Sequence, residues 1–217
     1  MQWLDLAFIH YEANPEDLRK LLPPGVELDL HEGRAWIGLI PFRLEDVTKR
    51  RWPSPAWLCD FPEFNVRTYV TAHGKRGIWF LSLNATNPLA VWTARTFFHA
   101  PYFVAEVGLT KTPAGVSYFA RRGRREFRAT VIPGEPMAAP PGSFAEWATE
   151  RYCLYSKGRY SPWLFRTEVQ HPKWPLQRAR VEVQANTFSD LPLGAMHPEV
   201  YFGRRLDVVM WHLDRIG

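Results

Sequence analysis

Polar and apolar side chains alternate along the segment Phe61–Val70, which reads Phe-Pro-Glu-Phe-Asn-Val-Arg-Thr-Tyr-Val. Successive side chains of an extended strand point to opposite faces, so Glu63, Asn65, Arg67 and Tyr69 share one face. A carboxylate, an amide and a guanidinium in one row can transfer protons and bind an anion. The row is either the solvated face of a sheet or part of an interior. In an interior, Glu63 and Arg67 need each other or a ligand, because an unpaired buried charge is costly.

A tyrosine and a glutamate further along the chain are candidates for the same site. Tyr102 and Glu106 lie four residues apart, on one face of a strand predicted over residues 102–109. The hydroxyl of Tyr102 can orient a carbonyl or carboxylate of a ligand by hydrogen bonding. The alternative is a core tyrosine whose hydroxyl has a partner within the protein.

Arg95 and His171 complete the set of candidate ligand contacts. Arg95 lies in a predicted helix, where it is either a pocket residue or the partner in a surface salt bridge. The segment 171–176, His-Pro-Lys-Trp-Pro-Leu, resembles a block of the YqjF-like family of bacterial proteins, and this resemblance makes His171 the best histidine for acid–base chemistry or ligand contact. The alternative for His171 is a turn histidine that packs on Trp174.

The helix that carries Arg95 has clear boundaries, and the segment that follows it has a recognisable pattern. Asn87 and Pro88 are typical of an N-cap and a first helical residue, and Pro101 ends the helix. Together with Ala90, Ala94, Thr96 and the following Pro101-Tyr102-Phe103, this stretch resembles the nucleophile segment of the acetoacetate decarboxylase-like superfamily. There the pattern is Ala-x-x-x-Gly-Arg-Glu followed by Pro-Lys-Lys, and the first lysine forms a Schiff base with a keto acid.

The resemblance implies that Tyr102 stands where those relatives carry the reactive amine. A phenol cannot form an imine, so the chain is not expected to be an acetoacetate decarboxylase. Lys111, the nearest lysine downstream, is nine residues further on, and a continuous strand would point it to the opposite face. The resemblance also matches Glu63 to a glutamate of the superfamily and Arg95 to its arginine.

Six segments in order resemble the YqjF-like family of bacterial proteins, a domain of unknown function within that superfamily. They are 22–25, 33–42, 61–70, 151–155, 174–177 and 204–208. The resemblance covers nearly the whole chain and implies a fold and a pocket without an established reaction. Since the decarboxylases of the superfamily assemble into large oligomers, it also raises a homo-oligomer as an expectation.

Proline and glycine divide the chain into short segments. Alternation over residues 3–11 predicts a first strand, with Leu4, Leu6, Phe8 and His10 on one face. Helices are predicted over about 14–22, 88–100 and 143–153. About ten short strands without βαβ alternation predict one mainly β domain over residues 1–217. Its sheet is expected to be antiparallel and barrel- or cone-like, of acetoacetate decarboxylase-like type.

The composition and the motifs exclude several kinds of site. A content of 46% hydrophobic and 23% charged residues is ordinary for a globular domain, and the net charge of +5 favours an anionic ligand. The seven histidines show no HxH or HExxH spacing, so no metal is expected. Without a Walker, GxGxxG or Gly-x-Ser-x-Gly motif, no cofactor is expected either.

The expected location is the cytoplasm. Cys59 and Cys153 have no CxxC spacing and are expected to be free thiols of a reducing compartment. No signal peptide and no membrane-length apolar run is visible, so no membrane partner is expected.

Two functions follow from these residues. The favoured hypothesis is a small-molecule-binding barrel for a carboxylate or carbonyl metabolite, with no complete catalytic constellation. The alternative is a non-enzymatic interaction protein that uses the aromatic loop 44–62 and the arginine-rich hairpin Arg121–Arg128. Nucleic acid is the less favoured partner for that hairpin, since only two aromatic residues lie near its tip.

Overall fold

A computed structural model describes residues 1–47, 59–158, 162–189, 191–194 and 197–217. The helices are α1 (Pro15–Arg19), α3 (Pro88–Phe97) and α4 (Phe144–Thr149). The strands are β1 (Gln2–Ala13), β2 (Glu27–Leu28), β3 (Ala35–Glu45), β4 (Phe61–Ala72), β5 (Lys75–Ala85), β6 (Tyr102–Val104), β7 (Glu106–Thr112), β8 (Gly115–Arg122), β9 (Arg125–Pro136), β10 (Cys153–Lys157), β11 (Leu164–Gln170), β12 (Leu176–Asn186), β13 (Glu199–Asp207) and β14 (Val209–Arg215).

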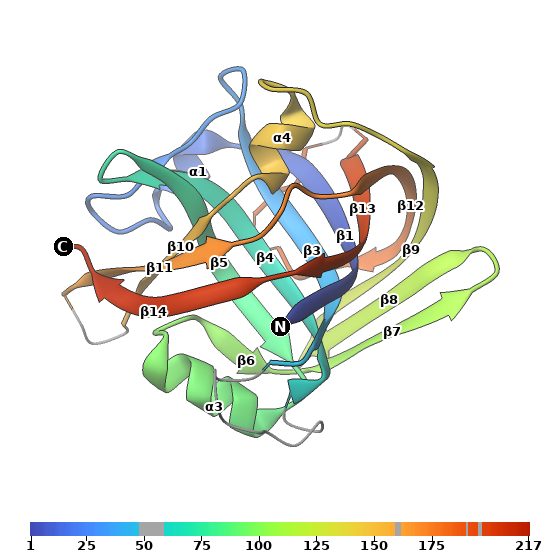
Figure 1. Cartoon of the computed structure of the whole chain (residues 1–217), viewed down its shortest axis with the longest axis horizontal. Helices are drawn as coiled ribbons and strands as arrows, with labels where there is room; N and C mark the ends of the chain where they lie inside the picture. Colours follow the sequence, from blue (N-terminus) through green and yellow to red (C-terminus); the bar gives the residue numbers. More distant parts are fainter. Residues whose placement is uncertain (48–58, 159–161, 190, 195–196) are drawn as a thin grey trace.

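The strands form one curved sheet of 14 strands (Figure 1). Its order is β14-β11-β10-β5-β4-β3-β1-β13-β12-β9-β8-β7, with β2 beside β4 and β6 beside β5. The mainly β class is therefore confirmed. The sheet differs from the antiparallel prediction in two pairings, because β10 and β6 both run parallel to β5. Over the described residues the sheet is open, with β14 and β7 at its ends.

The curvature covers both faces of the central strands β1, β3 and β4. On one face, Phe64 and Val66 of β4 pack with Phe127 of β9, and the Phe64 and Phe127 rings stack 4.6 Å apart. On the other face, Tyr69 of β4 packs with Trp147 of α4. Since both faces are covered, the polar row of β4 has no solvated side to occupy.

A bulge changes the alternation predicted for β1. Asp5 has a φ of 46°, and the pairing with β3 shifts register between Leu4 and Ile9. Trp3, rather than Leu4, therefore packs with Leu6 and the cluster on their face. His10 stays on the predicted face.

Three predicted elements have different bounds. The strand predicted over 102–109 is interrupted at Ala105, which separates β6 from β7. The helix predicted over 143–153 ends at Thr149, because Glu150 has a non-helical backbone (φ −86°, ψ 74°), and Cys153 already begins β10. The last predicted strand is two strands, β13 and β14.

The helix starts follow the sequence signals. The Asn87 side chain accepts hydrogen bonds from the backbone N–H groups of Leu89 and Ala90. The Ser143 hydroxyl accepts one from the N–H of Glu146. Capping by a neighbouring side chain is therefore sufficient to place the N-terminus of each of these two helices.

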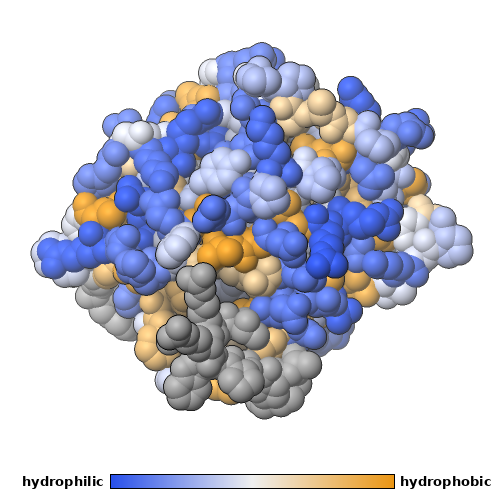
Figure 2. All heavy atoms as spheres, in the orientation of Figure 1, coloured by the Kyte–Doolittle hydropathy of each residue, from blue (hydrophilic) through white to orange (hydrophobic). Residues whose placement is uncertain are grey.

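The polarity of the surface is what the ordinary hydrophobic and charged content of the chain leads us to expect. The face drawn in Figure 2 carries mostly hydrophilic side chains around smaller apolar areas. Among the described residues, no helix is both long and apolar enough to cross a membrane. Cys59 and Cys153 are buried free thiols, as the sequence predicts.

Candidate functional site

The polar row of β4 lies in the protein interior. Glu63 and Asn65 are each 3% exposed, Arg67 is 6% exposed and Tyr69 is 1% exposed. Of the two readings that the alternation leaves open, the structure selects the buried one. Each of these polar groups therefore needs a partner.

The partner of Glu63 is Tyr102. The Tyr102 hydroxyl donates a 2.7 Å hydrogen bond to Oε2 of Glu63. Strand β6 brings Tyr102 there, because it pairs with β5 at Leu83 and β5 in turn pairs with β4. The Asn65 amide lies 3.4 Å from Oε1 of Glu63, and its own Oδ1 has no partner among the described residues.

This arrangement places a titrating carboxyl group beside a neutral phenol. Burial raises the pKa of Glu63 to about 7, although the hydrogen bonds from Tyr102 and Asn65 oppose the rise. Burial, and then the charge on Glu63, raise the pKa of Tyr102 well above its ordinary value. Near neutral pH, Glu63 can therefore exchange a proton while Tyr102 remains a hydrogen-bond donor.

Arg67 is buried without a carboxylate partner among the described residues. Its hydrogen bonds are long: Nε donates over 3.3 Å to the Tyr69 hydroxyl, and Nη2 donates over 3.5 Å to the carbonyl of Ala148. Its guanidinium carbon lies 5.5 Å from the ring centroids of both Phe8 and Tyr69. Aromatic faces stabilise a cation but do not neutralise it.

Gly38 makes room for this arginine. It lies opposite Arg67 in the β3–β4 pairing and opposite His10 in the β1–β3 pairing. A Cβ at residue 38 would lie 3.3 Å from Cγ of Arg67 and 3.3 Å from the Tyr69 hydroxyl. The missing side chain thus lets groups from three strands approach one another.

His10 closes this group on the β1 side. It is fully buried, and its Nε2 lies 2.5 Å from the Tyr69 hydroxyl. Burial, and then the charge of Arg67, hold the pKa of His10 well below its usual value. The ring of a neutral His10 can accept a hydrogen bond from the Tyr69 hydroxyl, while the oxygen of that hydroxyl accepts one from Arg67.

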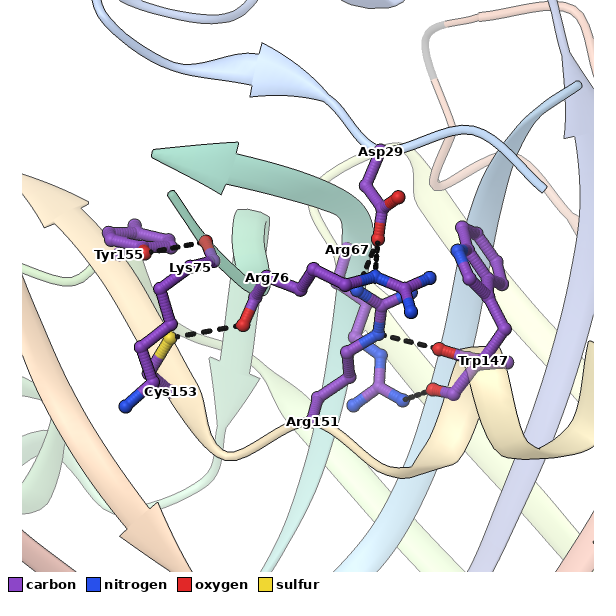
Figure 3. A network of polar contacts seen from close by, with 9 residues as sticks. Asp29, Arg67, Lys75, Arg76, Trp147, Arg151, Cys153 and Tyr155 are labelled. Atoms are coloured by element: carbon purple, nitrogen blue, oxygen red, sulfur yellow. Dashed lines mark hydrogen bonds and ion pairs between the residues drawn. The ribbon is translucent and has the colours of Figure 1, made fainter. Parts of the chain in front are cut away.

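A second buried arginine lies beside this group (Figure 3). Arg151 is 4% exposed, and its guanidinium carbon lies 4.9 Å from the Tyr69 ring centroid. Its Nη1 is 2.5 Å from Oδ2 of Asp29, and Nε of Arg76 is 2.7 Å from the same oxygen. Burial raises the pKa of Asp29, but its bonds to Arg76 and Arg151 outweigh this and lower it. One oxygen of Asp29 therefore serves two guanidinium groups, those of Arg76 and Arg151.

Three predicted site residues lie outside this group. Arg95 is exposed on α3, and Glu106 is exposed on β7, where it pairs with Arg121 at 2.7 Å. The break at Ala105 separates Glu106 from Tyr102. His171 is buried, and its ring nitrogens face the carbonyls of Pro172 (2.7 Å) and Arg151 (3.3 Å).

Besides Tyr69, which was placed on the polar face of β4 but not in the site, four residues of the group were not predicted as site residues: His10, Asp29, Gly38 and Arg151. A signal existed for His10, since it is the polar member of the apolar face formed by Leu6 and Phe8. For the other three, local sequence carries no comparable signal. Gly38 lies opposite Arg67, 29 residues further along the chain, and Asp29 and Arg151 are 122 residues apart.

Two hollows are described in the structure, and neither is lined by Glu63, Arg67 or Tyr102. One, of about 320 Å³, lies beside Asp5 and Lys111. The other, of about 540 Å³, lies beside Ser82 and Phe103. Lys111 pairs with Asp5 at 2.7 Å. Within the part of the chain that the structure describes, no cluster of three or more potential metal ligands occurs.

The features behind the alternative function are only partly described. Most of the loop 44–62 falls outside the described residues. In the hairpin Arg121–Arg128, Arg121 pairs with Glu106 and Arg128 with Glu126, each at 2.7 Å. These are the surface ion pairs expected of a solvated charge run.

The architecture is that of acetoacetate decarboxylase-like proteins. It superposes with a TM-score of 0.73 on the enduracididine biosynthesis enzyme MppR complexed with pyruvate, covering 100% of this chain and 89% of that chain at 14% identity. For the acetoacetate decarboxylase from Legionella pneumophila subsp. pneumophila, the TM-score is 0.71, with 100% and 87% covered at 15% identity. At such identities the likeness concerns the fold.

The sequence itself identifies the family. Residues 1–204 match the model of DUF2071, described as an uncharacterized conserved protein. The chain is 38% identical over 220 residues to the uncharacterized protein YqjF of Bacillus subtilis (strain 168), covering 98% of this chain and 90% of that protein. The chain belongs to the DUF2071 family, which confirms the resemblance seen in the sequence.

Proposed function

We propose that this protein binds a small carboxylate or carbonyl metabolite at the buried group formed by Glu63, Asn65, Arg67 and Tyr102. The observation that carries the proposal is the state of Arg67. A guanidinium keeps its charge in proteins, and this one is buried without a carboxylate partner among the described residues. A ligand carboxylate would supply the missing counter-charge.

The neighbouring groups suit the rest of such a ligand. The amide oxygen of Asn65 has no partner among the residues that the structure describes, so it can accept a hydrogen bond from a ligand hydroxyl, and Tyr102 is a phenol donor held by Glu63. Glu63 can gain or lose a proton near neutral pH, and once protonated it can donate to the phenol oxygen, so that the single Tyr102 proton becomes available to a ligand carbonyl oxygen. Glu63 is the group that would exchange a proton with a bound carbonyl compound.

The ligand would enter past Tyr102. Neither described hollow reaches Glu63, and Tyr102 is the half-buried member of the group. It lies on β6, a strand of only three residues. Movement of this short strand would break one hydrogen bond to Glu63 and open the row. The pyruvate complex of the similarly folded MppR supports a small 2-oxo acid as the first probe.

The test is binding of pyruvate and acetoacetate, measured as a rise in the melting temperature. A ligand that binds only the folded state stabilises it by about 2.7 kcal/mol at a concentration of 100 Kd. We expect stabilisation of the wild type and of Arg95→Met, since Arg95 is exposed on α3. We expect none for Arg67→Met. Equal stabilisation of both variants would contradict the proposal.

Native mass spectrometry gives an independent measurement. Protein purified without added ligand should carry a small bound acid in the wild type and lose it in Arg67→Met. The same spectra report the subunit count, which tests the homo-oligomer expectation.

A further inference from the structure

A buried aspartate lines the hollow of about 320 Å³. Asp5 of β1 is only 4% exposed, and its Oδ2 lies 2.7 Å from Nζ of Lys111 on β7. Its Oδ1 is shielded from water and has no hydrogen-bond partner among the residues that the structure describes. A buried carboxylate oxygen without a donor is costly, so a ligand group that donates a hydrogen bond there would relieve that cost.

The backbone at Asp5 departs from strand geometry. Its φ is 46° although it lies inside β1, and it forms part of the bulge described above. Positive φ is uncommon for a residue other than glycine, and such outliers and bulges gather at functional sites, where they redirect a side chain. The buried Tyr118 hydroxyl donates a 2.5 Å hydrogen bond to the carbonyl of Asp5. The position of the carboxylate is therefore fixed by the fold.

Arg204 of β13 lies beside Asp5. In the β1–β13 pairing, the residues on either side of Asp5 pair with those on either side of Arg204. Arg204 is exposed and lines the same hollow. Two cationic groups, those of Arg204 and Lys111, therefore accompany one carboxylate.

The other walls of the hollow are mostly apolar. Phe202 of β13 and Val116 of β8 are buried, and Ile132 and Pro133 of β9 also line the hollow. Small-molecule sites are mostly apolar with a few placed polar groups, and this volume is at the lower end of their range. The hollow therefore suits a molecule of the size of an aliphatic amino acid.

We infer that this hollow binds a small zwitterion, namely an α-amino acid with an aliphatic side chain. Its ammonium group donates to Oδ1 of Asp5, and its carboxylate accepts from Lys111 and Arg204. Its side chain packs against Phe202 and Val116. Hydrogen bonds between charged groups are stronger than those between neutral groups, so both ends of the zwitterion contribute to the affinity.

The ligand exchanges one ion pair for two. The Lys111 side chain is 62% exposed, and its ion pair with Asp5 is the one described for it among the described residues. When the ligand ammonium reaches Asp5, Lys111 moves aside and pairs with the ligand carboxylate. This movement also uncovers Oδ1 of Asp5 for the ligand.

The inference does not depend on the proposed function. Phe202 and Val116 belong to the cluster that contains Phe64. The side chain of Phe64 lies on the face of β4 opposite to that of Glu63, because the two residues are adjacent in the strand. The two sites therefore use different faces of the sheet.

The experiment compares L-leucine with its two halves. These are 3-methylbutylamine, which lacks the carboxylate, and 4-methylpentanoate, which lacks the ammonium group. Two-dimensional NMR of the whole protein should show saturable shifts at the backbone amides of Asp5, Thr112 and Val116 with leucine. Each half should bind at least about tenfold more weakly, because charge-assisted hydrogen bonds are lost. Equal affinity for all three compounds, or no saturable shift with leucine, would overturn the inference.

Two variants separate the roles of the charges. Asp5→Asn keeps the size of the side chain, and asparagine tolerates a positive φ, so the variant should fold and should bind leucine at least about tenfold more weakly. Lys111→Met removes the competitor for Asp5, so 3-methylbutylamine should bind about tenfold more tightly than to the wild type. An ion pair with a purely structural role does not predict this gain.

The ion pair between Lys20 and Asp17 provides matched controls. It has the same 2.7 Å separation, and neither residue lines the hollow. Lys20→Met and Asp17→Asn should leave the affinities for leucine and for the amine unchanged. Wild-type affinity for leucine in Asp5→Asn, or equal changes in the variants of both ion pairs, would overturn the inference. If Lys111→Met does not fold, Asp5→Asn and the ligand series still decide it.

Discussion

The hydroxyl of Tyr102 and the carboxyl group of Glu63 form a 2.7 Å hydrogen bond inside the protein. The two residues are 39 positions apart and come from strands that do not pair directly. Burial raises the pKa of Glu63 to about 7, and the hydrogen bond from Tyr102 limits that rise. The protonation state of the site is thus set jointly by burial and by one phenol.

Removal of the phenol hydroxyl should raise the pKa of Glu63 further. In Tyr102→Phe the carboxylate loses a donor that stabilises its charged form, so we expect the pKa of Glu63 to lie above about 7. The measurement is an NMR titration of the 13C-labelled carboxyl group. Tyr152→Phe, which removes the exposed hydroxyl bonded to Glu150, is the control and should leave the pKa of Glu63 unchanged. A fall in the pKa of Glu63 in Tyr102→Phe would contradict the assignment.

Stability should depend on pH through Glu63. Its pKa is raised from 4.5 in the unfolded chain to about 7 in the folded protein. Its stabilising contribution is therefore complete below pH 4.5 and is lost as the pH rises through about 7. Over the whole pH range, this loss lowers the free energy of unfolding by roughly 3 kcal/mol. Chemical denaturation between about pH 5 and pH 9 measures it.

Two substitutions separate Glu63 from other groups in that pH range. Glu63→Gln should flatten the decline in stability, because the amide does not ionise. Glu106→Gln, at an exposed position in a surface ion pair, should keep the decline. A decline of equal size in Glu63→Gln would place its origin elsewhere.

The two buried arginines should respond to substitution in opposite directions. Arg67→Met removes a buried charge that lacks a carboxylate among the described residues, so the ligand-free protein should gain roughly 1–3 kcal/mol. Arg151→Met leaves Asp29 without its buried partner and should cost roughly 3–5 kcal/mol. Urea denaturation of both variants gives the comparison. Similar losses in both would mean that Arg67 is already neutralised in the free protein.

Arg67 should depend on the space that Gly38 leaves by having no side chain. In Gly38→Ala the new methyl group meets Cδ1 of Ile40 at 3.2 Å, besides its contacts with Arg67 and Tyr69. We expect a loss of roughly 1–2 kcal/mol, as crowding exceeds the entropy gained from the substitution. Gly108→Ala is the matched control in a strand, since nothing lies within 4 Å of its new methyl group. That variant should be neutral or slightly stabilised in the same denaturation experiment.

Borohydride treatment with acetoacetate should give no covalent adduct. A Schiff base needs an uncharged amine, which relatives obtain by burying a lysine. Among the described residues, Lys20, Lys75 and Lys111 pair with carboxylates, and Lys157 and Lys173 are exposed. Mass spectrometry of the treated protein is the measurement, with an acetoacetate decarboxylase as the positive control. An adduct on any lysine would show that the nucleophile lies elsewhere than residue 102.

Several features were predictable because short-range rules determine them. The cap at Asn87, the stop before Pro101 and the alternation of Glu63, Asn65 and Arg67 all depend on neighbouring residues. The break at Ala105 and the bulge at Asp5 were not predicted. Both depend on how a strand pairs with distant strands, and both change which side chains share a face.

Sequence alone therefore determined the strand-rich class, the family and the composition of the polar row. Only the tertiary structure decided that this row is buried, that Glu63 meets Tyr102, and that Asp29 serves Arg151 and Arg76 but not Arg67. The physical reason is that alternation defines two faces of a strand without stating what covers them. In this sheet, segments remote in sequence cover both faces of β4, and that covering turns an ordinary polar face into a buried group of charges.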